Sequence, residues 1–301
     1  MRNQYACRLP LGIFTVVSAL FVANLKADDA VVTAPSEELR AAFKLAPFYQ
    51  KAIVFGGFPI VSSDKVSDYA LREAAFIVDQ MLIGRDDIRQ ALVANKVRMA
   101  IMSPTELTCD IPEHSDLNPP AYWNRRARGL GSTRERPAVS CGEENLLALK
   151  GDPYPAESII VHEFGHAIHD MGMVNVDPGF DARLKTVYRE ALDEGLWKGT
   201  YAASNHHEYW AEGVQSWFNT NRANDHDHND IDNREKLKVY DPRLCVLLAE
   251  VFPKNDWSYV KPTKRTVAAH LTGFDREAAP KFSWPADVIK QFDEYEGKKK
   301  K

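Results

Sequence analysis

Two histidines one helical turn apart are the residues of this 301-residue chain whose types and spacing point most directly to chemistry. They belong to the segment His162-Glu163-Phe164-Gly165-His166, in which both imidazoles would lie on one face of a helix and reach a single zinc ion. Glu163 lies beside them, and a carboxylate there can take a proton from a zinc-bound water that attacks a carbonyl group. We therefore predict a catalytic zinc site with His162 and His166 as ligands and Glu163 as general base.

A catalytic zinc ion needs a third protein ligand, and the residues directly after His166 do not provide it. The sequence Ala-Ile-His at 167–169 lacks the glycine and the later histidine that extend this motif in metzincins. A second predicted helix carries Glu208 and Glu212 one turn apart. Two such carboxylates can provide one zinc ligand and one hydrogen-bond acceptor for a ligand imidazole, and we assign Glu208 to the first role and Glu212 to the second.

Other residues near this helix leave alternatives open. His206 and His207 directly precede Glu208, and because histidine is the commonest metal ligand, each is an alternative third ligand. Glu212 has the alternative of a solvated surface acid, although apolar residues flank it. His169 lies near the face that carries the first two histidines, and we interpret it as a histidine that supports the ligands or belongs to the core.

Tyr201 lies in the loop that leads into the second helix, within the stretch KGTYAASN at 198–205. From there a phenol can approach the reacting carbonyl oxygen and donate a hydrogen bond to the tetrahedral intermediate. The alternative is an aromatic side chain that only packs within the loop. We expect the catalytic role.

The two motifs together resemble the gluzincin pattern of the anthrax lethal factor family, and of bacterial secreted peptidases that cut between prolines. HEFGH is followed, 42 positions after its second histidine, by the Glu of EYWAE, with a tyrosine seven residues before that Glu. The resemblance covers about residues 156–218. It implies His162, His166 and Glu208 as zinc ligands. It also implies Glu163 as the base and Tyr201 as the catalytic tyrosine. Tyr209 and Trp210 stand where two phenylalanines are typical, which changes the walls of the site more than its chemistry.

Helical periodicity predicts the elements that hold these residues. The expected fold is α+β, a mainly helical zincin-type catalytic domain with a small mixed α/β N-terminal lobe at about 36–104. A connection rich in Pro, Gly, Arg and Asn follows at 105–155, with PAVSC as its one strand-like run, and the zinc-binding part spans 156–301. Helices are predicted at 37–51, 69–82, 86–94, 156–172, 180–197, 206–219 and 242–251, and strand-like runs at 52–61 and 96–103.

The N-terminus predicts export. Residues 1–27 contain two arginines, an apolar run from Leu9 to Ala23 and a cleavage point after Ala27, which is typical of a signal peptide. The run is shorter than the ~20 apolar residues that cross a bilayer, so we expect no membrane anchor to remain. Residues 28–301, interpreted as one secreted unit, hold 35 basic and 42 acidic residues. This acidic balance disfavours nucleic acid as a partner.

Cysteines and acids outside the two motifs suggest two further features. In an oxidising compartment, Cys109 and Cys141 are the favoured disulfide pair, whereas Cys245 falls in an apolar helical run and is expected as a buried thiol. The acidic segment 225–232 has a superficial likeness to a calcium loop. Because Asp230 stands where an EF-hand needs glycine and Lys236 where it needs glutamate, we favour a solvated or substrate-facing loop.

These observations favour a secreted zinc endopeptidase that acts on peptide or protein substrates. One competing interpretation is a zinc-containing binding or structural module without turnover. A site kept only for folding would tend toward four protein ligands, and the presence of Glu163 and Tyr201 argues against it. Another is a zinc amidase acting on a non-protein amide, such as a cell-wall crosslink.

Overall fold

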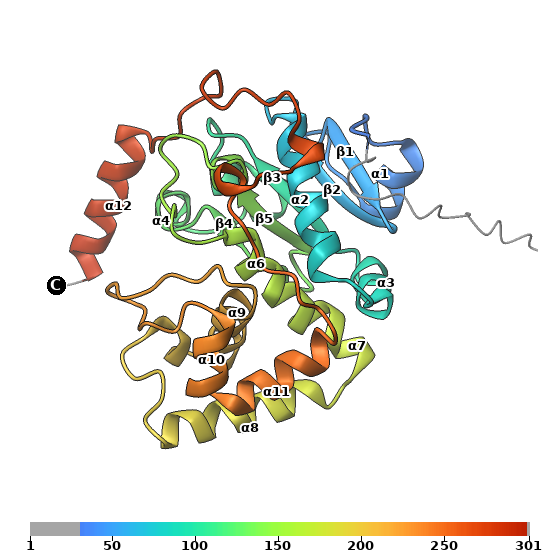
Figure 1. Ribbon diagram of the computed structural model, residues 1–301. Helices are drawn as coiled ribbons and strands as arrows, with labels where there is room; N and C mark the ends of the chain where they lie inside the picture. The colour runs from blue at the N-terminus through green and yellow to red at the C-terminus, as the bar shows by residue number, and fades with distance from the viewer. Residues whose placement is uncertain (1–30, 300–301) are drawn as a thin grey trace, which may run out of the picture.

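The computed structural model describes residues 31–299 and confirms the α+β fold (Figure 1). One five-stranded sheet lies in the first half of the chain, and helices dominate the second half. The predicted signal peptide, 1–27, lies outside the described residues. Within the described range, no helix is both long and apolar enough to cross a membrane. The strands are β1 (Lys51–Phe55), β2 (Phe58–Ser62), β3 (Arg98–Met102), β4 (Gly129–Leu130) and β5 (Ala138–Gly142).

The sheet is mixed and has the strand order β1-β2-β3-β5-β4. The predicted run 52–61 forms an antiparallel hairpin of β1 and β2, with Gly56 and Gly57 at positive φ in its turn. Strands β2, β3 and β5 pair in parallel, and every residue in them is buried, as is typical of a parallel sheet covered on both faces. The last strand, β4, runs antiparallel to β5.

Alternate side chains of the strands belong to two cores. Ile60 and Met99 join the larger core with helices α2 (Asp68–Met81) and α6 (Ile159–Ala167), whereas Val61 and Ala100 join a smaller one on the other face. The larger core continues through α6 into the helices of the second half of the chain. The sheet and the helical half are therefore joined by continuous apolar packing.

Most predicted helices are present. Helix α2 and α3 (Asp86–Ala94) match their predictions, and Ser67 caps α2 through a hydrogen bond from the N–H of Tyr69. The helix predicted at 37–51 is wrong in length: α1 is Glu37–Phe43, because Lys44 adopts a left-handed conformation that ends it.

The central helix predicted at 156–172 consists of α6 and a π-helical continuation, η4 (Ile168–Met173). The other helices of the second half are α7 (Val174–Val176), α8 (Phe180–Asp193), α9 (His206–Trp217), α10 (Arg234–Tyr240), α11 (Pro242–Val251) and α12 (Ala286–Lys299). Of these, α7, α10 and α12 are not predicted from the sequence.

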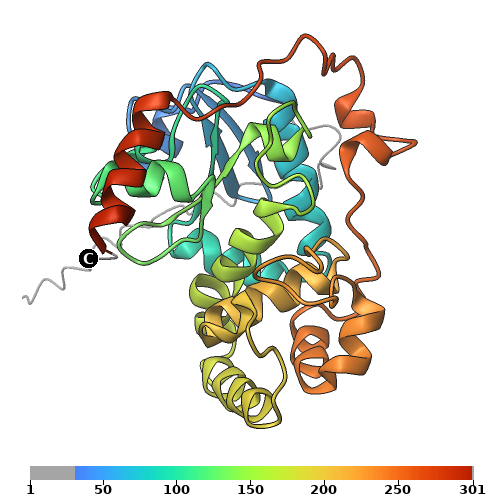
Figure 2. The same cartoon turned by 90° about the vertical axis from the view of Figure 1, so that its left-hand side faces the viewer.

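The connection at 105–155 is more structured than predicted. It contains η2 (Thr108–Asp110), η3 (Pro112–His114), α4 (Pro120–Arg126), α5 (Glu143–Leu146) and strands β4 and β5. Figure 2 shows α12 alongside α4, and the rings of Tyr122 and Phe292 stack with centroids 5.8 Å apart. A buried ion pair between Arg128 and Glu144 fixes the start of β4.

The predicted disulfide is not present, because all three cysteines in the described chain are free thiols. Cys141 lies in β5 with its side chain fully buried in the larger core. Cys109 lies on η2, where its Sγ is 3.8 Å from the carbonyl oxygen of Pro120. The prediction paired them because both fall in one loop-rich stretch, but Cys141 belongs to a central position of the sheet. Cys245, expected as buried, is half-buried on α11.

Candidate metal centre

Helices α6 and α9 bring the three predicted ligands together. The Nε2 atoms of His162 and His166 lie 3.2 Å apart, and Glu208 Oε2 lies 3.2 Å from the first and 3.3 Å from the second. Three donor atoms that converge in this way form a group that could hold one metal ion. The two histidines come from one face of α6, as their spacing requires, and Glu208 comes from the first turn of α9.

Local packing explains why α9 approaches α6 so closely. Asn205 caps α9 by accepting hydrogen bonds from the N–H groups of His207 and Glu208, which fixes the first turn. Trp210 Nε1 then donates to the carbonyl oxygen of Gly165 over 2.9 Å. A Cβ at Gly165 would lie 3.3 Å from Val214, so a larger residue there would push the helices apart.

The predicted ligand His162 is oriented mainly by a residue that the sequence analysis missed. Its Nδ1 lies 2.9 Å from Gln215 Oε1, and Glu212 Oε1 is farther away, at 3.6 Å. Gln215 Nε2 donates to Glu157 Oε2 at 3.0 Å, so its carbonyl oxygen is turned toward the imidazole. This arrangement favours a proton on Nδ1 and leaves the Nε2 lone pair free for a metal. Gln215 lies two turns after Glu208 on α9, which is the only sequence signal that could have identified it.

Glu212 is close to this ligand but is not its nearest partner. Its side chain is 3% exposed, which rules out a surface acid. His228 Nε2 lies 3.3 Å from Glu212 Oε2, and Asn221 Nδ2 donates to the same oxygen over 2.9 Å. Glu212 therefore adds negative charge behind His162 while its own position is held by residues after α9.

The electrostatics of the three donors favour a bound cation. Burial lowers the pKa of His162, but the hydrogen bond to Glu208 and the nearby carboxylates outweigh it and raise this pKa to about 10. Burial raises the pKa of Glu208, but its contacts with both imidazoles reverse the effect and leave it well below its ordinary value. The carboxylates that raise the pKa of His162, those of Glu208, Glu163 and Glu212, would equally stabilise a metal cation bound in place of its proton.

The predicted base, Glu163, is half-buried beside the donors. Burial raises the pKa of its carboxyl group, and the two neighbouring histidines oppose that shift. Strand β4 passes close by: a Cβ at Gly129 would lie 3.1 Å from Glu163 Cγ, and one at Gly131 would lie 2.9 Å from the Cβ of His166. Glycines at these positions let the chain run directly against the helix that carries the donors.

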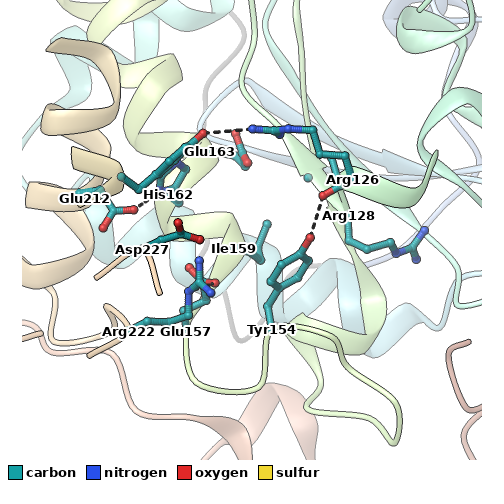
Figure 3. Close-up of a pocket in the computed structure, with 13 residues that line it drawn as sticks. Arg126, Arg128, Tyr154, Glu157, Ile159, His162, Glu163, Glu212, Arg222 and Asp227 are labelled. Carbon is teal, nitrogen blue, oxygen red and sulfur yellow. Dashed lines mark hydrogen bonds and ion pairs between the residues drawn. The ribbon is translucent and has the colours of Figure 1, made fainter. Parts of the chain in front are cut away.

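A cavity of about 310 Å³ opens beside His162 and Glu163, and Tyr201 and Arg126 line it as well (Figure 3). Tyr201 belongs to η5 (Tyr201–Ala203), and its ring centroid is 6.3 Å from that of His162. Burial raises the pKa of this phenol, so it keeps its proton. Its backbone N–H donates to the carbonyl oxygen of Asp227 over 2.7 Å, which fixes the start of η5.

Arg126 is a second residue that the sequence analysis missed. It is the last residue of α4, and its Nη2 lies 3.4 Å from the Tyr201 hydroxyl. Because a guanidinium can only donate, the phenol accepts at this contact and its own proton stays available for another acceptor. No motif marks Arg126, since it lies in the stretch that the sequence analysis interprets as a loop.

The alternative third ligands, His206 and His207, belong elsewhere. His207 Nδ1 lies 3.0 Å from Asp170 Oδ1, and His206 Nε2 lies 3.1 Å from Asp181 Oδ1. His169, expected to support the first ligands or the core, faces these acids. His169, Asp170 and His207 form the other group of donors within residues 31–299 that could hold a metal ion.

The acidic segment 225–232 folds back toward the cavity. Asp227 lines the cavity together with Arg222 (Figure 3). Asp225 is occupied by contacts with His228 Nδ1, at 2.7 Å, and with Arg222. No metal-binding group among the described residues includes this segment.

No protein-family model matches this chain, and no curated protein matches it.

Proposed function

We propose that this chain is a secreted zinc-dependent endopeptidase. One observation carries the proposal: the donor atoms of His162, His166 and Glu208 converge beside a cavity that Glu163 and Tyr201 also line. A metal held at one side of an open cavity, with a carboxylate and a phenol that are not among its ligands, is the arrangement of a hydrolytic site.

The donor set fits zinc. Two imidazole nitrogens and one carboxylate oxygen suit this ion, and three protein ligands leave a position for water or substrate, as in catalytic zinc sites. Bound there, zinc would lower the pKa of a water molecule to ~7 and polarise the carbonyl group under attack. The hydrogen bond from His162 Nδ1 to Gln215 would hold this imidazole in place as a ligand.

The chain's own residues can carry out the remaining steps. Glu163 accepts the proton of the attacking water on its carboxylate and passes it to the amine that leaves. Tyr201 donates its hydroxyl proton in a hydrogen bond to the oxygen of the tetrahedral intermediate. Arg126 lies 3.4 Å from that hydroxyl and adds positive charge near the developing oxyanion.

An extended peptide suits the surroundings of the site. Strand β4 is the last strand of the described sheet and is paired only with β5. It passes beside Glu163 and His166, so a substrate strand that pairs with its outer edge would present a peptide bond to the base. The resemblance to gluzincins and the predicted signal peptide support the same class of activity and export.

The test is digestion of a diverse peptide library by the purified protein, with the new termini identified by mass spectrometry. We expect internal cleavage that a chelator abolishes and added zinc restores. A protein that binds zinc but cleaves no peptide contradicts the proposal. Release of a non-protein amide by that protein would favour the amidase, and inertness toward both would favour a binding module.

A further inference from the structure

Five side chains gather one turn beyond the first centre and have no role in it. They come from η4, from the start of α8 and from the start of α9, and they are His169, Asp170, Asp181, His206 and His207. Three of them, His169, Asp170 and His207, offer donor atoms that all lie within 4.8 Å of one another. Asp170 Oδ1 lies 3.2 Å from His169 Nδ1 and 3.0 Å from His207 Nδ1.

His169 presents an unused nitrogen to this group. Its side chain is 2% exposed, yet within the described chain its Nδ1 makes no hydrogen bond. Its other nitrogen, Nε2, lies 3.2 Å from Asp181 Oδ1, and Lys185 holds the second oxygen of that carboxylate at 2.7 Å. An acceptor at Nε2 favours the proton there, so the lone pair of Nδ1 faces Asp170 and His207.

We propose that His169, Asp170 and His207 bind a second divalent metal ion, with Asp181 orienting the imidazole of His169. Two imidazole nitrogens and one carboxylate oxygen are the donors that zinc and its neighbours in the first transition series prefer, whereas calcium and magnesium prefer oxygen ligands. A buried imidazole nitrogen that makes no hydrogen bond is costly, and a metal would satisfy it.

A metal ion would have both a path from solvent and enough space at this group. A cavity of about 320 Å³ is lined by Asp170, His207 and Asp181 together with apolar side chains of η4 and the start of α8. The side chains of His207 and Asp170 are 41% and 30% exposed, so an ion can enter from solvent and keep water as its remaining ligands. This site shares no donor with the first.

The backbone conformation at His169 and Asp170 gives independent support for a functional site. His169 and Asp170 lie in η4, where the α-helix changes to the wider π-helix. Such segments are rare and occur frequently at functional sites. A metal bound here would join η4 to the first turn of α9, directly beside Glu208, and would therefore hold the two helices of the first centre together.

Metal counting tests this proposal without relying on activity. Apo protein is dialysed against micromolar zinc, and bound zinc per folded chain is measured by elemental analysis, with circular dichroism confirming the fold. We expect two ions in the unaltered protein and one in either His207→Ala or Asp170→Asn. Asp177→Asn is the matched control: Asp177 lines the same cavity but bonds to Arg183 and to the N–H of Gly179, and this variant should keep two ions.

His162→Ala separates the two centres. If it removes one ion and His207→Ala removes the other, both sites bind metal. If only His207→Ala lowers the count, the second site stands and the zinc assignment of the first fails. A single ion that His207→Ala and Asp170→Asn leave in place would overturn the second site, as would extra zinc that neither variant removes.

Discussion

Two groups of candidate metal donors lie along α6, its continuation η4 and the start of α9, and they differ in what surrounds them. The first group opens on a cavity that also holds Glu163, Tyr201 and Arg126. At the second group, the carboxylate next to the three donors is already engaged, because Asp181 contacts two histidines and a lysine. Only the first group therefore combines three donors with a carboxylate and a phenol left over for reaction.

This difference teaches that donor geometry alone does not make a hydrolytic site. Histidine and carboxylate donors at comparable distances occur in both groups, so both are suited to bind metal. Proton transfer and oxyanion stabilisation need further groups that are not ligands. The first centre is expected to react and the second to hold its helices in place, and the following substitutions test that division.

The largest effect is expected from Glu163→Gln, which removes the proton acceptor of the first centre. Loss of a general base lowers kcat by about 10²- to 10⁴-fold. Because Glu163 is not a ligand, zinc content should stay unchanged. Peptide cleavage and zinc content are measured on the same sample. Full turnover by this variant would show that Glu163 is not the base.

Tyr201→Phe should give the next largest effect. Removing one donor to the oxyanion lowers kcat by about 10²- to 10³-fold, and KM should change little because the hydrogen bond strengthens only in the transition state. Tyr188→Phe is the matched control, since its hydroxyl donates to the carbonyl oxygen of Ala203 rather than facing the cavity. Equal losses in both variants would mean that Tyr201 acts only by packing.

The sequence predicts the parts of the first centre that depend on local geometry. His162 and His166 share a helix face because of their spacing, and Glu208 lies on a helix whose capping residue, Asn205, directly precedes it. Gln215 and Arg126 are different. Their roles depend on how α9 packs against α6 and on how α12 supports α4, and spacing in the sequence carries little of that information.

The fold shows the same division. Strongly periodic helices such as α2, α3 and α11 match their predicted ranges closely. The parallel pairings of β2 with β3 and of β3 with β5 join residues far apart in the sequence, so no local pattern predicts the sheet order. Strand β4 has only 2 residues, too few for a periodic pattern. The disulfide prediction was wrong for a related reason, because neighbouring cysteines in a loop-rich stretch need not share a surface, and Cys141 is part of the core.

A pair of substitutions tests whether each centre depends on its own orienting residue. Gln215→Met removes the acceptor for Nδ1 of His162, and Asp181→Asn weakens the acceptor for Nε2 of His169. Loss of such a partner typically weakens metal binding about 10- to 100-fold. Zinc competition titrations should show the loss at one centre only in each variant. A loss at the opposite centre would mean that the two groups are not separate sites.

The smallest effect is expected from His206→Ala, which compares His206 with its neighbour His207 at the second centre. His206 contacts Asp181 at 3.1 Å and is not one of the three donors, whereas His207 is. Losing one hydrogen bond costs about 0.5–1.5 kcal/mol, so zinc affinity at the second centre should fall by at most about tenfold and that at the first should not change. His207→Ala should instead lose a whole equivalent of zinc. Loss of an equivalent of zinc in His206→Ala, with none in His207→Ala, would reverse the assignment and make His206 the ligand.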